Sequence, residues 1–337
     1  MFSNQKSVAF DPRDFPSVKF PAEFGRRYLI SIDTEEEFDW DGPFERKGHT
    51  TITVPMLERF QQFVQKYEIK PIYFIDYSIV EDDAATSFLK SAVVGGHADI
   101  GVHLHPWINP PFDEETNRYN SFAGNLPKEL EEEKLTQLRD RIEEKTGVSS
   151  AVYRAGRYGV GPNTVEILKK LGFVVDSSAR SRFDYSEEGG PNFRHIGPKP
   201  FWLDRPDLME IPLTTVFSGL LRRQGHLLSS IVNQSGFANA LLSNSKMLER
   251  IPLTPEGISA REAKEAIDVA LDDDLKLLVF SFHSPSLSPG HTPYVQSDDD
   301  LHAFYDWWRD IIGYLNDRGV ASISMKELIL AAGISVK

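Results

Sequence analysis

The stretch Asp99-Ile-Gly-Val-His103-Leu-His105-Pro-Trp107 places two histidines, one residue apart, at the end of a short apolar segment. The apolar segment predicts a β-strand, and residues two apart on a strand point to the same face. Three other apolar segments also end in polar residues: Ile30-Ser-Ile-Asp33-Thr-Glu35, Val152-Tyr-Arg154 and Leu277-Leu-Val-Phe-Ser-Phe-His283. Acidic, imidazole and guanidinium groups at the ends of successive strands are typical of the active site of an α/β barrel.

Strands and helices are expected to alternate along the chain. The patterns predict strands at 28–32, 70–77, 99–105, 150–153, 173–176, 277–282 and 321–324, and helices at 54–67, 84–94, 128–146, 162–171, 259–271 and 299–315. Such alternation indicates parallel strands with helices outside the sheet.

The remaining segments interrupt this rhythm. Residues 1–25 are expected to form an irregular N-terminal arm, 180–206 a long loop, 211–217 a further strand and 218–255 an inserted helical segment. A chain of 337 residues is within the range of one barrel domain, so we expect residues 1–337 to form a single domain with an insertion.

Composition excludes several classes of function. The net charge of −13 argues against binding to a nucleic-acid backbone, which depends on clustered lysine and arginine. The absence of cysteine excludes disulfides, thiolate metal sites and a cysteine nucleophile. No run of about 18 apolar residues predicts a membrane span, and the N-terminal residues do not resemble a secretory signal. We therefore expect a cytoplasmic protein that binds neither nucleic acid nor membrane.

Two carboxylates follow the first strand. Asp33 and Glu35 are two residues apart and point to the same face, and three more acidic residues follow directly: Glu36, Glu37 and Asp39. Paired carboxylates can divide the work, one binding a cation and the other acting as a base. An acidic surface turn is the alternative interpretation.

The histidine pair suggests a metal site. Imidazole is a common ligand of zinc, and two histidines with one carboxylate leave a position open for water. The alternative is that one of His103 and His105 only caps the strand by a hydrogen bond. His97 precedes the strand and is expected to be structural.

Two further basic residues are candidates for catalysis. The planar fork of Arg154 can hold a carboxylate in bidentate geometry, either Asp33 or a substrate acid, and a surface salt bridge is the alternative. His283 ends an apolar strand, so its ring is expected at the barrel mouth as a general acid, unless it is a satisfied core histidine.

Aromatic residues near these segments could bind sugar rings, although they could equally belong to the core. Candidates for such faces are Trp107, Tyr158, Tyr294 and Phe112. The glycine- and proline-rich loop from Leu287 to Tyr294, which contains His291, is expected to shape the pocket.

Taken in order, these motifs resemble those of the polysaccharide deacetylase family (carbohydrate esterase family 4). The resemblance spans about residues 28–285 and rests on five segments: Ile32-Asp33-Thr34-Glu35, Gly96-His97-Ala-Asp99-Ile-Gly101-Val-His103, Arg154-Ala-Gly-Arg-Tyr158-Gly159, Val-Asp176-Ser-Ser and Phe282-His283. The order of the motifs is more specific than any one of them.

This resemblance implies a distorted (β/α)7 barrel that removes acetyl groups from acetylated sugars. It implies a divalent metal, first of all Zn²⁺ and otherwise Co²⁺, Ni²⁺ or Fe²⁺, bound by His103 and His105 with Glu35 or Asp33. Asp33 would be the base, oriented by Arg154. His283 would be the acid, held charged and oriented by Asp176.

The chain departs from the family pattern at three points. Thr34 occupies the usual place of the second acid, His105 must replace a histidine that is expected further along, and the third motif is one residue longer and lacks its proline. Two other functions therefore stay open: metal-free hydrolysis of a cyclic amide or ureide, as in allantoinase-like members, and a catalytically inactive glycan-binding protein.

Overall fold

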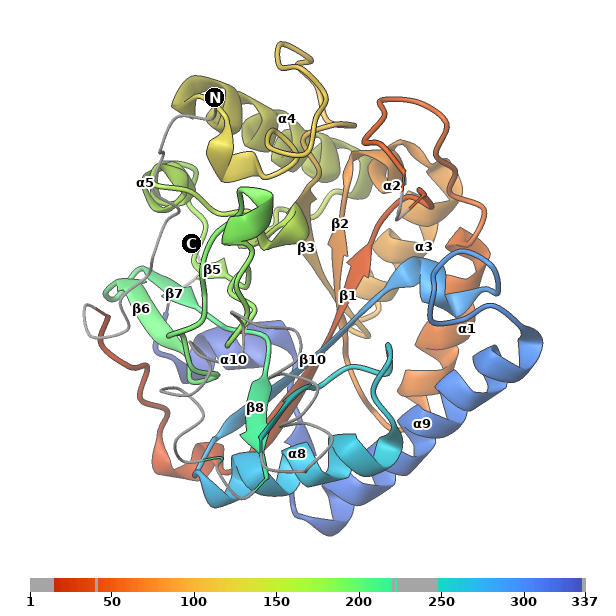
Figure 1. The fold of residues 1–337 in the computed structure, drawn as a ribbon, viewed down its shortest axis with the longest axis vertical. Coiled ribbons are helices and arrows are strands. Elements are labelled where there is room, and N and C mark those ends of the chain that lie inside the picture. Colours follow the sequence, from red (N-terminus) through yellow and green to blue (C-terminus); the bar gives the residue numbers. More distant parts are fainter. Residues whose placement is uncertain (1–14, 40–41, 220–221, 223–247, 335–337) are drawn as a thin grey trace.

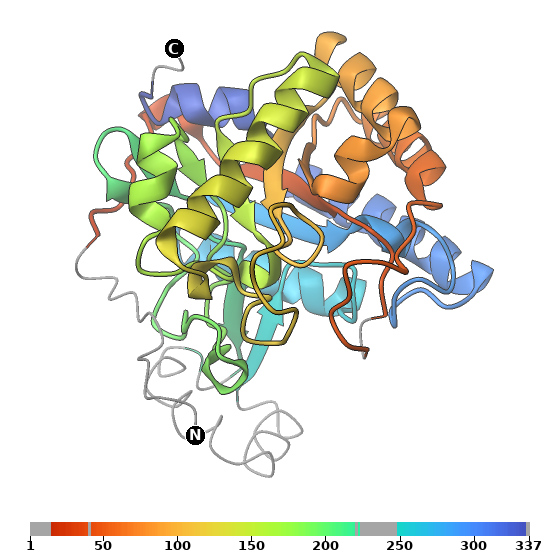
Figure 2. The same cartoon turned by 90° about the horizontal axis from the view of Figure 1, so that it is seen from above.

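The computed structural model describes residues 15–39, 42–219, 222 and 248–334. Its centre is a curled sheet surrounded by helices (Figure 1), and the view turned by 90° shows the same helices packed around the sheet (Figure 2). The sheet has nine strands in the order β10-β1-β2-β3-β4-β5-β7-β6, with β11 paired to β1, and every pair is parallel except β6 with β7. The parallel sheet with its alternating helices confirms the predicted α/β class.

The strands of the main sheet are β1 (Arg27–Thr34), β2 (Ile72–Ile75), β3 (Asp99–Leu104), β4 (Val152–Ala155), β5 (Val175–Asp176), β6 (Phe201–Asp204), β7 (Leu208–Glu210), β10 (Leu277–His283) and β11 (Ala321–Ser322). A second sheet contains β8 (Thr215–Ser218) and β9 (Glu249–Pro252), which are antiparallel. The helices are α1 (Val54–Gln65), α2 (Tyr77–Glu81), α3 (Asp83–Val94), α4 (Lys128–Thr146), α5 (Thr164–Lys170), α8 (Ala260–Asp272), α9 (Asp298–Asp317) and α10 (Met325–Ala331).

Apolar side chains on one face of each helix pack against the sheet. In α1 the buried residues include Val54, Leu57, Phe60 and Val64, a helical spacing that forms one continuous stripe. The ring centroid of Phe60 lies 4.9 Å from that of Phe282 in β10. Complete burial of such a side chain contributes roughly 1.5–3 kcal/mol.

Helix ends are specified locally. A capping box at Ser259 begins α8, as the sequence predicts, with the Ser259 hydroxyl and the Glu262 carboxylate exchanging bonds with each other's backbone N–H. Helix α4 has the predicted bounds and ends at Gly147, whose φ of 72° is a left-handed conformation that glycine adopts without strain.

Of the helices that the structure describes, none combines the length and the apolar character needed to cross a membrane.

Strand register brings the predicted site residues to one edge of the sheet. Asp33 pairs with His283 between β1 and β10, and His103 pairs with Arg154 between β3 and β4. On the far side of the barrel, the Thr214 N–H donates to the carbonyl of Val279 in β10 at 3.2 Å. The chain that follows β7 therefore hydrogen-bonds to β10, the strand at the other end of the sheet order.

Three expectations are corrected. The predicted loop at 180–206 contains β6, and the strand expected at 211–217 begins only at Thr215. The described ends of the expected helical insertion at 218–255 are strands, since Ser218 ends β8 and 249–252 form β9. Residues 220–221 and 223–247 of that segment lie outside the described residues. Strands of three or four residues are too short to show a hydrophobic period, so the sequence pattern did not reveal them.

Candidate active site

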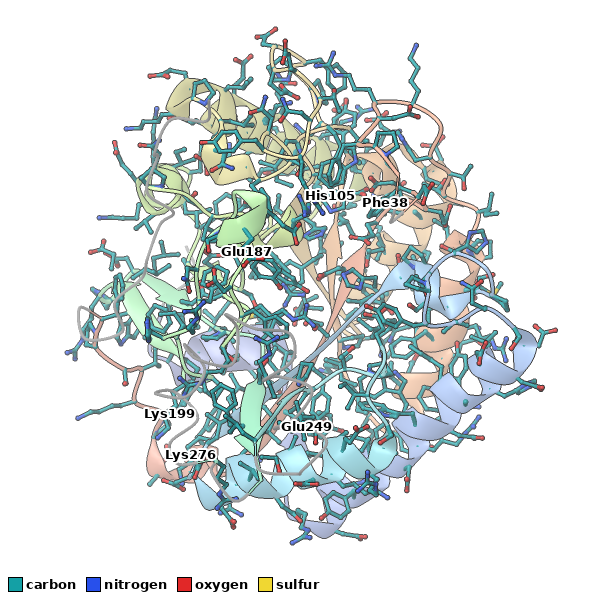
Figure 3. The ribbon with its side chains drawn as sticks, viewed as in Figure 1. Phe38, His105, Glu187, Lys199, Glu249 and Lys276 are labelled. Carbon is teal, nitrogen blue, oxygen red and sulfur yellow. The ribbon has the colours of Figure 1, made fainter. Side chains whose placement is uncertain are left out.

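A cavity of about 640 Å³ opens at the edge of the sheet where β1, β3 and β10 end. The five residues predicted to bind metal or transfer protons line it: Asp33, Glu35, His103, His105 and His283. Its aromatic lining consists of Phe38, Phe44, Trp107, Tyr158, Tyr185 and Tyr294. Figure 3 shows Phe38 and His105 side by side at this edge, and their ring centroids are 6.3 Å apart.

Asp33 and Arg154 form a buried ion pair. Nη1 of Arg154 donates to Oδ1 of Asp33, Nη2 donates to the hydroxyl of Ser31 at 2.9 Å, and Nε donates to the carbonyl of Ser177 at 2.9 Å. All three nitrogens of the guanidinium are thus held by hydrogen bonds. Burial raises the pKa of Asp33, but the charge of Arg154 and those of two histidines outweigh it, so the pKa lies below its usual value. Arg154 therefore contacts Asp33, one of the two partners that the sequence left open, through Oδ1.

His283 is held by Glu256. Nδ1 of His283 lies 2.8 Å from Oε2 of Glu256, and the His283 backbone N–H donates to Oε1 at 3.0 Å. The hydroxyl of Ser286 donates to the same Oε1 at 2.6 Å. Burial lowers the pKa of His283, but the charges of Glu256, Glu35 and Asp33 overcome this and raise it to about 9. The other nitrogen, Nε2, lies 3.9 Å from Oδ2 of Asp33.

The predicted role of Asp176 is wrong, because Glu256 occupies the position beside His283. Asp176 ends β5, pairs in register with Glu210 of β7, and accepts hydrogen bonds from the backbone N–H and the hydroxyl of Ser178. It is buried and does not line the cavity. Burial raises its pKa to about 6. The register with β7, a strand that the sequence pattern did not reveal, explains where the carboxyl lies.

Glu35, His103 and His105 form a cluster that can hold a metal ion. Oε2 of Glu35 lies 3.4 Å from Nε2 of His103 and 3.4 Å from Nε2 of His105. These separations are long for hydrogen bonds, whereas ligands about 2.0–2.1 Å from a tetrahedral zinc ion lie about 3.4 Å apart. Oε1 of Glu35 is buried without a hydrogen-bond partner among the described residues. The donor set of two imidazoles and one carboxylate therefore fits a divalent ion such as Zn²⁺.

The other nitrogen of each histidine is already engaged. Nδ1 of His103 lies 3.1 Å from the carbonyl of Arg154, and Nδ1 of His105 lies 3.0 Å from Oε2 of Glu36. These contacts leave both Nε2 atoms facing Glu35, as is usual for histidines that bind metals. Burial lowers the pKa of His105, but the charges of Glu36 and Glu35 raise it well above its usual value. The same two carboxylates would attract a metal cation, which replaces that proton when it binds.

The sequence did not reveal that Glu36 and Asp76 support His105 through hydrogen bonds. Oε1 of Glu36 accepts the indole N–H of Trp107 at 2.9 Å, and the Glu36 backbone N–H donates to Oδ2 of Asp76 at 3.0 Å. Asp76 follows β2, so its position at a strand end was the available signal. At Gly156 a Cβ atom would lie 2.3 Å from Cδ2 of His105, so this close approach requires glycine.

The predicted sugar-binding residues are only partly brought together. Tyr158 and Tyr294 line the cavity, and Trp107 lines it while one ring face stacks on His105 at 4.3 Å between centroids. His291 lies outside this cavity, in a separate hollow with Thr50 and Gln296, which corrects its predicted role. The backbone of its loop folds back on itself, since the Gly290 N–H donates to the carbonyl of Val295 at 2.9 Å. Phe112 is exposed and does not line the cavity either.

Comparison of the sequence with protein-family models and with curated proteins gives no match. Among solved structures, a protein from Mycobacterium smegmatis assigned as a polysaccharide deacetylase is 16% identical, with a TM-score of 0.52 over 98% of both chains. The 4-α-glucanotransferase of Thermococcus litoralis is 11% identical, with a TM-score of 0.51 over 91% of this chain and 40% of that chain. A family 4 acetyl xylan esterase from Clostridium thermocellum, in complex with a cobalt ion, is 12% identical, with a TM-score of 0.46 over 92% and 93% of the two chains.

At these identities a structural likeness shows the fold and not the reaction, and the deacetylase and the glucanotransferase, both with TM-scores above 0.5, bear different names. The resemblance seen in the sequence is confirmed at this level: the chain has the distorted α/β-barrel fold of the polysaccharide deacetylases.

Proposed function

We propose that the protein is a hydrolase that uses a divalent metal ion to remove an acetyl group from an N- or O-acetylated sugar. The observation that carries the proposal is the cluster of Glu35, His103 and His105, which opens into the same cavity as the carboxylate of Asp33 and the imidazole of His283. This combination supplies a cation site, a base and an acid within one enclosed space.

Glu35, His103 and His105 would hold the ion. When bound, it would polarise the acetyl carbonyl and lower the pKa of a water molecule toward about 7. Two nitrogen ligands and one oxygen ligand suit Zn²⁺ and leave a coordination position open.

Asp33 acts as the base in this proposal. Its carboxylate is ionised and oriented by Arg154, so it can accept a proton from the water that attacks the acetyl carbon. Three further N–H groups of the Arg154 guanidinium donate to Ser31 and Ser177. These bonds fix the guanidinium, and with it the carboxylate that it contacts. The pair is therefore preorganised for proton abstraction.

His283 acts as the acid. Its Nδ1 is held by Glu256, so Nε2 is the atom that gives a proton to the leaving nitrogen or oxygen as the bond to the acetyl carbon breaks. Because the carboxylate of Glu256 favours the protonated imidazole, the acid is charged before the reaction begins. A backbone N–H near Tyr158 would share the charge of the oxyanion.

The first test is the metal content of the purified protein, measured by plasma mass spectrometry, together with acetate release from acetylated chitooligosaccharides and acetylated xylooligosaccharides. We expect about one metal ion per chain and acetate release that chelation abolishes. A double variant, His103→Ala with His105→Ala, should lose both. The exposed His97→Ala variant is the matched control and should lose neither.

Other results would favour the other functions. Turnover of a cyclic amide or ureide that survives chelation would replace the proposal with metal-free hydrolysis. Saturable binding of glycans, without turnover by the zinc- or cobalt-loaded protein, would replace it with a glycan-binding protein.

A further inference from the structure

The arginines that line the cavity differ in how they are neutralised. Arg157 pairs with the carboxylate of Glu188, and Arg118 lies 3.4 Å from the same carboxylate. Arg180 also lines the cavity, but no carboxylate within the described part of the chain forms an ion pair with it. Arg180 is therefore a cation in the cavity wall whose counter-ion is missing from the described residues.

The guanidinium of Arg180 is nevertheless fixed in place. Its Nη1 donates to the hydroxyl of Tyr185 at 3.3 Å, and its Cζ lies 4.0 Å from the ring centroid of Phe183 and 5.4 Å from that of Tyr158. Aromatic faces hold a guanidinium without using its N–H donors. Of the five donors, one is used within the described structure, so the fork remains available to a ligand.

The backbone of Arg180 is rigid as well. Arg180 pairs with Leu213 beyond the end of β5, and the hydroxyl of the buried neighbour Ser181 donates to the carbonyl of Leu213 at 2.7 Å. Arg180 thus follows a strand of the barrel, beyond its end, and lines the same cavity as the other site residues. This placement favours a role in ligand binding over that of a solvated surface charge.

A second arginine near Arg180 adds to the positive charge that no described carboxylate pairs with. The guanidinium of Arg250 lies 3.9 Å from the centroid of the same Phe183 ring, and its Nη1 donates to the carbonyl of Arg182, a neutral acceptor. Burial and the nearby charge of Arg180 lower the pKa of Arg250. Two guanidiniums therefore contact the same ring, although of these two only Arg180 lines the cavity itself. Desolvated charges are costly unless they are paired, so an anionic ligand would stabilise this wall.

We propose that Arg180 binds a carboxylate on the substrate, so that the preferred substrate is an acidic acetylated sugar. This inference rests on the proposed function and narrows its substrate class. A single planar fork matches a carboxylate in bidentate geometry. A phosphate dianion is disfavoured, because Asp33, Glu35 and Glu256 line the same cavity and no lysine of the described chain does.

The test is binding of four sugars to the metal-loaded protein by titration calorimetry, which needs no turnover. The probes are N-acetylglucosamine, N-acetylglucosaminuronic acid, N-acetylmuramic acid and N-acetylglucosamine 6-phosphate. We expect at least one of the two carboxylated sugars to bind 10-fold or more tightly than the neutral sugar and more tightly than the phosphate. Arg180→Gln should abolish this preference and leave the affinity for N-acetylglucosamine within about 2-fold.

Two further variants make the test decisive. Arg261→Gln removes the same charge from an exposed position outside the cavity and should keep the preference. Arg180→Lys keeps the positive charge but not the planar guanidinium, so it should lose most of the preference for carboxylated sugars. If thermal unfolding shows that Arg180→Gln is much less stable than the wild type, Arg180→Lys provides the test in its place.

The inference is overturned if neither carboxylated sugar is preferred, if the phosphate binds most tightly, or if Arg180→Gln folds and keeps the preference. Acetate release is measured separately with the same probes. A carboxylate preference without release from any acetylated sugar would contradict the proposed function and leave the carboxylate site standing. Release that is equal for neutral and acidic sugars would contradict the carboxylate site alone.

Discussion

Oε2 of Glu256 lies 2.8 Å from Nδ1 of His283, and Oε1 of the same carboxylate accepts the His283 backbone N–H at 3.0 Å. One carboxylate therefore fixes both the ring and the backbone of the residue that ends β10. Glu256 comes from the chain just after β9, outside the main sheet. This contact decides which imidazole nitrogen faces Asp33, and hence which atom can transfer a proton.

Replacing Glu256 by glutamine should shift the pH dependence of catalysis. Glu256 raises the pKa of His283, and the protonated ring is the active form of the acid, so its loss should move the alkaline limb of the kcat profile to lower pH. We expect kcat to fall about 10–100-fold with KM nearly unchanged. The exposed Glu166→Gln variant is the control, and an alkaline limb that stays in place would refute the positioning role.

Asp33→Asn and Glu35→Gln should separate the base from the metal ligand. Asp33→Asn should lower kcat about 10²–10⁴-fold and keep the metal, because the carboxylate is bound to Arg154. Glu35→Gln should lose the metal, because its oxygen lies 3.4 Å from both Nε2 atoms. Metal content and acetate release are measured on both proteins. Loss of metal from Asp33→Asn alone would reverse the two assignments.

Glu36→Gln should weaken metal binding without removing a ligand. Oε2 of Glu36 holds Nδ1 of His105, and such supporting carboxylates typically contribute 10–100-fold to metal affinity. The dissociation constant is measured by competition with a chromogenic chelator. The exposed Glu45→Gln should bind as the wild type does, and equal affinity of Glu36→Gln and wild type would show that this contact does not tune the site.

Glu131→Gln should stabilise the protein at alkaline pH. Burial of Glu131 raises its pKa from 4.5 to about 7, so the folded state holds this proton more tightly than the unfolded state. The wild type is therefore expected to lose stability as pH rises from 4.5 through 7, whereas the neutral glutamine avoids that loss. At pH 8.5 the variant should be more stable by about 1–3 kcal/mol.

The measurement for Glu131 is urea unfolding at pH 5 and pH 8.5. Glu129→Gln, exposed on the same helix α4, is the control and should change the free energy of unfolding little at either pH. A Glu131→Gln protein whose advantage does not grow with pH would contradict the expectation.

Much of the fold was predictable because its signals are local. Helical spacing of apolar residues predicts α1, and the capping box at Ser259 predicts the start of α8. Asp33, His103, Arg154 and His283 could be predicted as neighbours, because each follows an apolar strand and parallel strands end at one edge. Neither inference requires knowledge of distant contacts.

The sequence by itself thus determined the α/β class, the order of strands and helices that position the site, and the residue types at the strand ends. Only the tertiary structure decided that Glu256, rather than Asp176, holds His283, that Glu36 supports His105, and that His291 lies outside the cavity. It also decided that Arg180 faces the cavity without a carboxylate partner among the described residues. The physical reason is that periodicity reports which face a residue occupies, whereas the partner of a side chain depends on register and on loops that pack from far along the chain.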